Sequence, residues 1–260
     1  MTLTTFASGS GGNCLLLSMG GTHVLLDAGI SYRRIRQNLK LSGLSPEQLS
    51  GVFITHAHSD HISGLGTFVK SCAVPLYAPA RVARDVARAY PAAEERLRII
   101  PVGETFSLGE IQVLAFPTSH DTAESVGYRL SGDSVFALAT DTGCVTEQIL
   151  SGLAGAEAAL IEANHDLNML RQGPYPYHLK QRILSDRGHL SNDTCAGLAV
   201  MLAERGTKYL VLGHLSRENN RPELALRTVQ RAVAGLPVQV FVAGAEERFT
   251  LTTEERLCAV

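Results

Sequence analysis

The stretch Thr55-His56-Ala57-His58-Ser59-Asp60-His61 places four possible metal ligands within six residues, directly after the apolar run Gly51-Val52-Phe53-Ile54. The apolar run predicts a short buried strand, and the polar residues after it predict a loop. Imidazole nitrogens and carboxylate oxygens suit zinc, manganese or iron better than calcium or magnesium. Because four ligands this close in sequence cannot all reach one ion without strain, the stretch predicts a site for two divalent metal ions at the end of a strand.

Further candidate ligands follow other apolar runs downstream. His120, Asp141 and His214 each come directly after a run that is typical of a strand. Asp27 ends another such run, so we expect its carboxylate to be nearly buried and to need a partner. Since a metal-bound histidine usually donates its second ring N–H to such a group, Asp27 is predicted to orient a ligand. A plain turn aspartate is the alternative.

Composition bounds the class of protein. The chain has 260 residues, 45% of them hydrophobic and 18% charged, which fits a globular α/β protein with a sizeable core. No low-complexity linker or charge run marks a boundary, so we expect one domain spanning residues 1–260. The net charge of −2 does not by itself demand nucleic acid. A polyanion would have to be held by a local basic patch or by bound metal ions.

Nothing in the sequence predicts export or membrane insertion. No apolar segment has the length of a membrane helix, and the N-terminus lacks the basic region of a signal peptide. The cysteines are odd in number, scattered, and never arranged as Cys-x-x-Cys, which favours reduced thiols in a cytoplasmic protein. They are Cys14, Cys72, Cys144, Cys195 and Cys258.

The glycine-rich loop Ser8-Gly9-Ser10-Gly11-Gly12-Asn13 joins the first two predicted strands. Its backbone N–H groups could face an anion, which would make Ser10 and Asn13 substrate contacts. However, no helix follows the loop and it lacks the lysine of a phosphate-binding loop. A tight connection between strands is therefore the first interpretation, and a substrate-facing loop is the second.

The histidine motif and the later ligands resemble the metallo-β-lactamase superfamily over essentially the whole chain. Asp27 matches the leading strand aspartate of that family. The resemblance implies an α/β fold, the αβ/βα four-layer sandwich, in which two mixed sheets pack face to face between outer helices. It also implies that His56, His58 and His120 hold one metal ion, that Asp60, His61 and His214 hold the other, and that Asp141 bridges the two.

Differences between subfamilies narrow the expected reaction. The lactamases proper carry cysteine where this chain has Asp141, so antibiotic hydrolysis is not expected. Glu162 and His189 resemble a Glu–His pair of the phosphodiesterase branch, which includes the tRNA 3′-processing endonuclease. Leu190 and Ser191 depart from that branch, which has serine and threonine at these positions.

The resemblance also implies a mechanism. Two divalent ions, zinc or manganese with iron as an alternative, would activate a water for attack on phosphorus. His189, kept protonated by Glu162, is then the candidate general acid for the leaving group, although the pair could instead brace the rim. Arg217, Lys180 or Arg182 could clamp a phosphoryl oxygen. The candidate catalytic residues are thus Asp60, Glu162, His189 and Arg217, and the candidate substrate contacts are Ser10, Asn13, His165, Lys180 and Arg182.

Within the superfamily the chain is most similar to the YycJ/WalJ-type group, through the motifs at residues 8–14, 162–166 and 188–192. That likeness implies a 5′→3′ exonuclease that acts on double-stranded DNA and takes part in DNA repair. A small-molecule hydrolase (of a cyclic phosphodiester, lactone or thioester) and an RNA-processing nuclease are the alternatives. The intact ligand set disfavours a non-catalytic regulator. A homo-oligomer, and the roles of His165 and His178, stay open.

Overall fold

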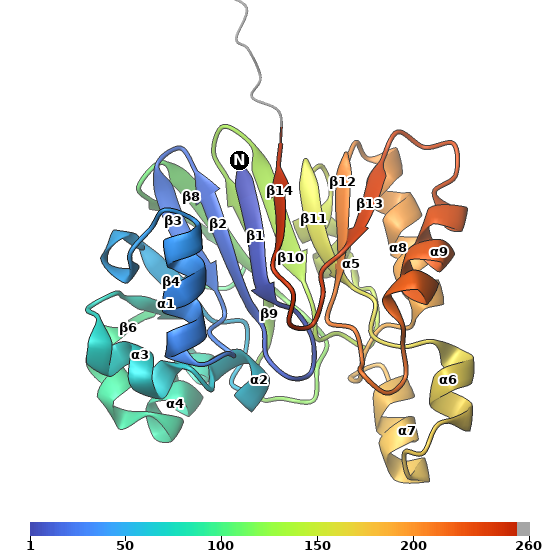
Figure 1. Cartoon of the computed structure of the whole chain (residues 1–260), viewed down its shortest axis with the longest axis horizontal. Helices are drawn as coiled ribbons and strands as arrows, with labels where there is room; N and C mark the ends of the chain where they lie inside the picture. The colour runs from blue at the N-terminus through green and yellow to red at the C-terminus, as the bar shows by residue number, and fades with distance from the viewer. Residues whose placement is uncertain (254–260) are drawn as a thin grey trace, which may run out of the picture.

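The computed structural model describes residues 1–253, so Cys258 lies outside the described part of the chain. Two sheets of seven strands face each other at its centre (Figure 1). The first sheet has the strand order β14-β1-β2-β3-β4-β5-β6, and the second has the order β13-β12-β11-β10-β9-β8-β7. The last two strands are therefore divided between the sheets, one at an edge of each.

The first sheet is antiparallel from β14 to β3 and parallel from β3 to β6. Its strands are β1 (Thr2–Ala7), β2 (Cys14–Met19), β3 (Thr22–Leu26), β4 (Gly51–Phe53), β5 (Leu76–Ala78), β6 (Leu97–Ile99) and β14 (Phe249–Thr252). The parallel part brings the carboxyl ends of β3 and β4 to the same edge, which places Asp27 beside the histidine motif.

The second sheet repeats this mixture, because it is antiparallel from β7 to β10 and parallel from β10 to β13. Its strands are β7 (Thr105–Leu108), β8 (Ile111–Pro117), β9 (Val126–Ser131), β10 (Val135–Ala139), β11 (Ala158–Glu162), β12 (Tyr209–Gly213) and β13 (Gln239–Val242). Strands β8, β10, β11 and β12 all end at one edge, which together with the ends of β3 and β4 we call the rim.

Helices cover the outer face of each sheet (Figure 1). Helices α1 (Tyr32–Leu41), α3 (Leu65–Ser71) and α4 (Ala80–Ala89) pack on the first sheet, and α5 (Glu147–Leu153), α8 (Asn192–Glu204) and α9 (Pro222–Ala232) pack on the second. The short helices α2 (Ser59–Ile62), α6 (Leu167–Gln172) and α7 (Tyr177–Leu184) lie at the rim end, and two 3₁₀ turns cover Pro46–Gln48 and Pro91–Arg96.

Three apolar layers separate these four layers of structure. In β2, Leu15 and Leu17 point into the layer between the sheets, whereas Leu16 points into the layer beneath the helices. In β11, Leu160 and Ile161 divide in the same way. Because successive side chains alternate across a strand, a strand covered on both faces needs a continuous apolar run. The predicted αβ/βα sandwich is confirmed.

Some strands and helices of the structure were not predicted from the sequence. Strand β7 lies at the edge of its sheet and is mostly exposed, so it carries no apolar run that would reveal it. Helices α6 and α7 fall in a stretch that reads as loop and basic residues, and both are short. In α6 the Asp166 carboxylate accepts from two backbone N–H groups of the first turn, which is the cap a short helix requires.

Two further features concern the cysteines and the length of the helices. The four cysteines in residues 1–253 are free thiols rather than disulfides. Among the helices of that part of the chain, none combines the length and the apolar character that spanning a bilayer would take.

Candidate metal centre

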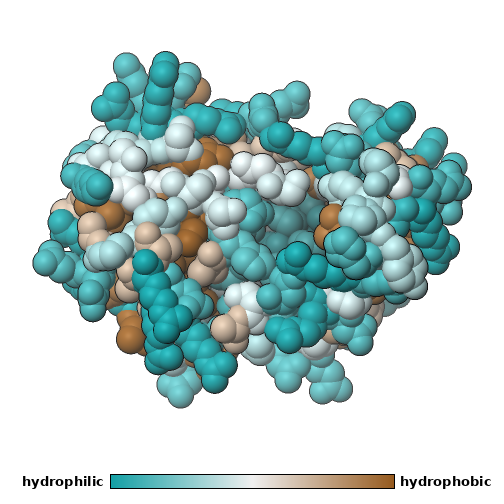
Figure 2. Space-filling model, turned by 90° about the horizontal axis from the view of Figure 1, so that it is seen from below, coloured by the Kyte–Doolittle hydropathy of each residue, from teal (hydrophilic) through white to brown (hydrophobic). Residues whose placement is uncertain are grey.

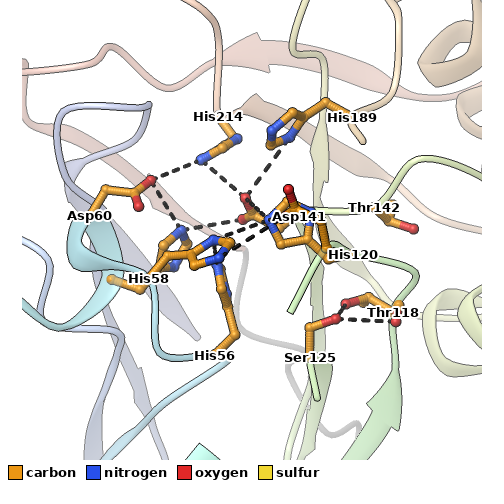
Figure 3. A network of polar contacts seen from close by, with 12 residues as sticks. His56, His58, Asp60, Thr118, His120, Ser125, Asp141, Thr142, His189 and His214 are labelled. Atoms are coloured by element: carbon orange, nitrogen blue, oxygen red, sulfur yellow. Dashed lines mark hydrogen bonds and ion pairs between the residues drawn. The ribbon is translucent and has the colours of Figure 1, made fainter. Parts of the chain in front are cut away.

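The candidate ligands gather at the rim, and both sheets contribute to them. The motif His56–His61 follows β4, while the remaining ligands come from loops after strands of the second sheet. His120 follows β8, Asp141 follows β10, and His214 follows β12. These side chains meet because β4, β8, β10 and β12 end at the same edge of the molecule (Figure 3).

Three rim residues hold a left-handed backbone. Asp27, Asp141 and His214 have φ of 62°, 56° and 55°, and they are the non-glycine residues in 1–253 with positive φ. That conformation costs an L-residue roughly 1–2 kcal/mol, and strained backbone of this kind gathers at functional sites. Hydrogen bonds fix it: the Asp27 carboxylate accepts from Thr55 N and Oγ1 at 2.9 Å each, and His214 N donates to Ser8 Oγ at 2.9 Å.

Three imidazoles form a first cluster. His58 Nδ1 lies 3.1 Å from His56 Nε2 and 3.2 Å from His120 Nε2. Nitrogen ligands about 2.0–2.1 Å from a tetrahedral zinc ion are separated by about 3.3 Å. The spacing of the three nitrogens is therefore close to that of ligands that share one ion.

Asp60, His61 and His214 form a second cluster. Asp60 Oδ2 lies 3.4 Å from His61 Nε2 and 3.5 Å from His214 Nε2. Asp141 lies between the clusters, with Oδ2 at 3.3 Å from His61 Nε2 and Oδ1 at 3.4 Å from His214 Nε2 and 3.7 Å from His120 Nε2 (Figure 3). This is the position that a bridging carboxylate would take.

The outward ring nitrogens of four of these histidines have partners of their own. The contacts are His56 Nδ1 to Thr55 Oγ1 at 3.0 Å, His61 Nδ1 to Asp27 Oδ2 at 2.7 Å, His120 Nδ1 to Gly188 O at 3.2 Å, and His214 Nδ1 to Glu162 Oε1 at 2.9 Å. Such contacts fix the tautomer and orientation of metal-binding imidazoles, so that Nε2 faces the cluster. In the fifth histidine the roles are exchanged: His58 turns Nδ1 toward the cluster and Nε2 toward Asp121 Oδ1, 3.8 Å away.

The charges at the rim favour bound cations. Burial lowers the pKa of His214, but Asp141, Asp60 and Glu162 outweigh burial and raise that pKa to about 10. The pKa of His61 is likewise lowered by burial yet raised overall by Asp141 and Asp27. Conversely, burial raises the pKa of the Asp141 carboxyl, but the His214 and His61 imidazoles bring it well below its usual range. The buried carboxylates thus demand positive charge.

One buried atom also fits a metal ion. Asp141 Oδ2 is buried and makes no hydrogen bond of good geometry, although His61 Nε2 lies 3.3 Å away. An unpaired buried polar atom costs roughly 1–3 kcal/mol, and an ionised one costs more. Four groups of these side chains each bring their ligand atoms within 4.8 Å of one another; two of the groups include Asp141, and the other two each share a histidine with one of these. These nitrogen and oxygen donors therefore suit two divalent ions.

A cavity of about 270 Å³ lies over the clusters. Figure 2 shows the face that carries it, with a hydrophilic hollow near the middle. Four of the candidate catalytic and substrate-contact residues line this cavity: Ser10, Asp60, Arg182 and His189. His189 Nδ1 also donates to Glu162 Oε1, 2.7 Å away, so the Glu–His pair expected from the sequence is formed, with His189 at the cavity wall and Glu162 buried behind it.

Other expected substrate contacts lie outside the lining. The Lys180 ammonium donates to Arg171 O at 2.7 Å, and Arg217 Nη2 donates to Glu246 Oε1 at 2.6 Å. Both cations therefore hold neighbouring structure together. Neither faces the space above the clusters.

Asn13 and His165 are buried beside the site. The Asn13 amide nitrogen lies 3.0 Å from His61 Nε2 and 3.4 Å from Asp60 Oδ2, so its contacts are with candidate ligands. His165 is 1% exposed, and neither ring nitrogen has a hydrogen-bond partner. Burial lowers its pKa to about 4, which keeps the ring neutral. His178 is exposed on α7.

Asp121 is a cavity residue that the sequence did not single out. Its Oδ2 pairs with the Arg182 guanidinium, and its Oδ1 lies 3.3 Å from His120 Nε2. The only sequence signal was its place directly after a candidate ligand. Its pairing with Arg182, 61 positions away, depends on the tertiary fold.

The sandwich and its rim of histidines and aspartates define a class of protein, and the chain belongs to the metallo-β-lactamase superfamily. A family model described as a β-lactamase superfamily domain matches residues 22–215. The predicted family is thereby confirmed.

Comparison with individual proteins is more specific than the match to the family. The chain is 40% identical over 240 residues to Exodeoxyribonuclease WalJ of Streptococcus pneumoniae, covering 90% of this chain and 89% of the relative. It is 36% identical over 239 residues to Exodeoxyribonuclease YycJ of Bacillus anthracis, covering 88% of each. The resemblance to the YycJ/WalJ-type group is confirmed.

Among solved structures, the chain is similar to the metallo-β-lactamase fold protein YhfI of Bacillus subtilis, with a TM-score of 0.73. The alignment covers 95% of this chain and 98% of that one. Because the sequence identity is 15%, this similarity supports the fold alone.

Proposed function

We propose that this chain is a metal-dependent exodeoxyribonuclease built as one hydrolase domain over residues 1–260. The observation that carries the proposal is the pair of ligand clusters joined by Asp141, beside the Glu162–His189 pair. The 40% identity with Exodeoxyribonuclease WalJ over 90% of the chain supports DNA as the substrate class.

Two divalent ions, zinc or manganese with iron as the alternative, fit the clusters. His56, His58 and His120 would hold one, Asp60, His61 and His214 would hold the other, and Asp141 would contact both. When bound, the ions supply Lewis acidity, which activates water and stabilises charge on phosphoryl oxygens. The chain itself contributes the orientation of each ligand, through the outward contacts of the rings.

His189 would donate the proton that the leaving alkoxide needs. Its ring lines the cavity, and Nδ1 is held 2.7 Å from Glu162 Oε1, which leaves Nε2 for substrate. Burial lowers the pKa of His189, but Glu162 outweighs burial and raises it, so the ring keeps its proton more readily. A positioned acid of this kind typically contributes about 10²–10⁴-fold to the rate.

Arg182 and Ser10 would contact the phosphate groups of the strand in the cavity. Arg182 is 60% exposed in its side chain and lines the cavity, so its guanidinium can meet a phosphate while it neutralises Asp121. For the finer specificity we propose cleavage of duplex DNA in the 5′→3′ direction, in a role in DNA repair.

The decisive experiment is a substrate comparison with metal-loaded protein. Chelated protein, reloaded with Mn²⁺ or Zn²⁺, is incubated with end-labelled duplex DNA, single-stranded DNA and RNA, and with bis-p-nitrophenyl phosphate. We expect duplex DNA to be degraded and a 5′ label to be released before a 3′ label. His58→Ala should abolish the activity, whereas His23→Ala, a strand histidine that contacts Ser18, should keep it.

Other outcomes separate the alternatives. Hydrolysis of bis-p-nitrophenyl phosphate with DNA and RNA left intact would exclude a nuclease and favour a small-molecule phosphodiesterase. Faster cleavage of RNA than of DNA would favour an RNA-processing enzyme.

A further inference from the structure

Helices α6 and α7, which we call the α6–α7 hairpin (residues 167–184), extend beyond the rim on one side of the cavity (Figure 1). The hairpin is fixed at its base. Ile183 is buried and its carbonyl accepts from His189 N at 3.0 Å, while Arg182 pairs with Asp121. It therefore forms one wall of the cavity next to the candidate metal centre.

The hairpin carries two tyrosines in different surroundings. Tyr175 lines the cavity. Tyr177, the first residue of α7, is 77% exposed, more than any other phenylalanine or tyrosine in residues 1–253. Each follows a proline, whose ring restricts the backbone of the turn between α6 and α7. One aromatic ring thus lies at the cavity wall, and a second lies in solvent near it.

The charge around the tyrosines differs from that of the chain as a whole. Residues 166–190 contain four lysines or arginines against two aspartates, whereas the whole chain has a net charge of −2. The basic residues are Arg171, Lys180, Arg182 and Arg187. Exposed aromatic rings among basic side chains are the combination that binds unpaired bases and their phosphates.

The size of the cavity defines what must happen to a duplex. Ligand pockets run from about 300 to 1,000 Å³, so this cavity of about 270 Å³ lies at the small end of that range. A single nucleotide that enters such a cavity from a duplex leaves its partner base at the duplex end. Unpairing and unstacking cost free energy, and the base that stays behind on the uncut strand loses its neighbour.

We propose that the α6–α7 hairpin recognises duplex ends: Tyr177 stacks on the terminal base of the uncut strand while the cut strand passes Tyr175 into the cavity. This inference rests on the proposed exonuclease function and adds the surface that selects duplex ends. Arg182 holds the phosphate that enters, and the stacked ring offsets the cost of opening the end. The terminal base of the uncut strand thereby covers the exposed ring of Tyr177, because a base and an aromatic ring stack on each other.

The test combines a protein change with a DNA change. Tyr177→Ala should lower kcat/KM on a blunt duplex by roughly 5- to 150-fold, the range that corresponds to stacking of one base, and Tyr177→Phe should stay within about twofold of the wild type. On a duplex whose uncut strand ends in an abasic residue, the wild type should fall to the level of Tyr177→Ala, and the variant should lose nothing further. Ile99→Ala, a truncation of a 69% exposed side chain on β6, should match the wild type on both duplexes.

A binding measurement makes the result independent of turnover. With 2-aminopurine at the end of the uncut strand and EDTA present, the fluorescence should change when the wild type binds and should not change with Tyr177→Ala. Wild-type rates for Tyr177→Ala on the blunt duplex, or equal losses on the blunt and abasic duplexes, would overturn the role of the hairpin. Failure of the wild type to cut any DNA would instead overturn the exonuclease function, so the two are distinguishable.

Discussion

At the scale of single residues, Glu162 connects the two halves of the site. Its Oε1 contacts His189 Nδ1 at 2.7 Å and His214 Nδ1 at 2.9 Å, and its Oε2 accepts from Thr142 N at 3.1 Å and Leu190 N at 3.2 Å. It is a positioning residue for both a candidate acid and a candidate ligand. Substitution of Glu162 would therefore mix two effects, and His189 is the better residue to test.

We expect His189→Ala to lower kcat on DNA by about 10²–10⁴-fold, because the departing alkoxide then lacks its proton donor. The same variant should keep most of its activity on bis-p-nitrophenyl phosphate, since p-nitrophenolate leaves without a proton. Steady-state rates on both substrates check this, with His23→Ala as the matched histidine control. Equal losses on both substrates would mean that His189 only braces the rim.

Much of the site could be read residue by residue from the sequence. The predicted ligands lie together because each follows a strand whose apolar run is visible in the sequence. Their outward partners were harder to predict. Asp27 was expected beside a ligand, but Thr55 Oγ1, Gly188 O and Asp121 become partners only through the tertiary fold.

At the scale of elements, α2 depends on one glycine of a neighbouring loop. A Cβ on Gly29 would lie 1.6 Å from Asp60 O and 2.8 Å from Asn13 N. Both are backbone atoms, so neither can move aside as the end of a flexible side chain could. The loop after β3 therefore approaches the helix that carries Asp60 as closely as a glycine allows.

Gly29→Ala should displace α2 and weaken metal binding at the second cluster. Calorimetric titration of chelated protein with Mn²⁺ measures this, and we expect the stoichiometry to fall from about two ions to about one, or the affinity of one site to fall at least tenfold. Gly197→Ala is the control, since a Cβ there meets nothing within 4 Å in helix α8. It should leave metal binding unchanged and stabilise the fold by roughly 0.4–1 kcal/mol. Two tight sites in Gly29→Ala would contradict the dependence.

Elements differed in how well the sequence revealed them. Strands covered on both faces, such as β11 with every residue buried, show a continuous apolar run. The α6–α7 hairpin shows no such pattern, because Leu170 and Ile183 are its buried positions; α6 depends on the Asp166 cap, and α7 depends on contacts with the rim. A short helix is marginal alone, so its stability comes from packing that the sequence does not display.

At the scale of the whole molecule, the candidate ligands join two sheets that are otherwise held together mainly by apolar packing. The first cluster takes His56 and His58 from beside the first sheet and His120 from the second, and the second cluster combines Asp60 and His61 with His214. An ion in either cluster would thus connect the sheets. Since the unfolded chain cannot present these ligands together, bound ions would stabilise the folded state.

We therefore expect chelated protein to unfold at a lower temperature than metal-loaded protein. At a free metal concentration of 100 times Kd, one site contributes about 2.7 kcal/mol, which for a chain of this size shifts Tm by roughly 5–10 °C. Differential scanning calorimetry with EDTA and with Mn²⁺ measures the difference. Asp141→Ala, which removes the shared carboxylate, should lose most of the increment, and His23→Ala should keep it. If elemental analysis finds two ions bound and Tm still does not rise, the ions do not tie the sheets together.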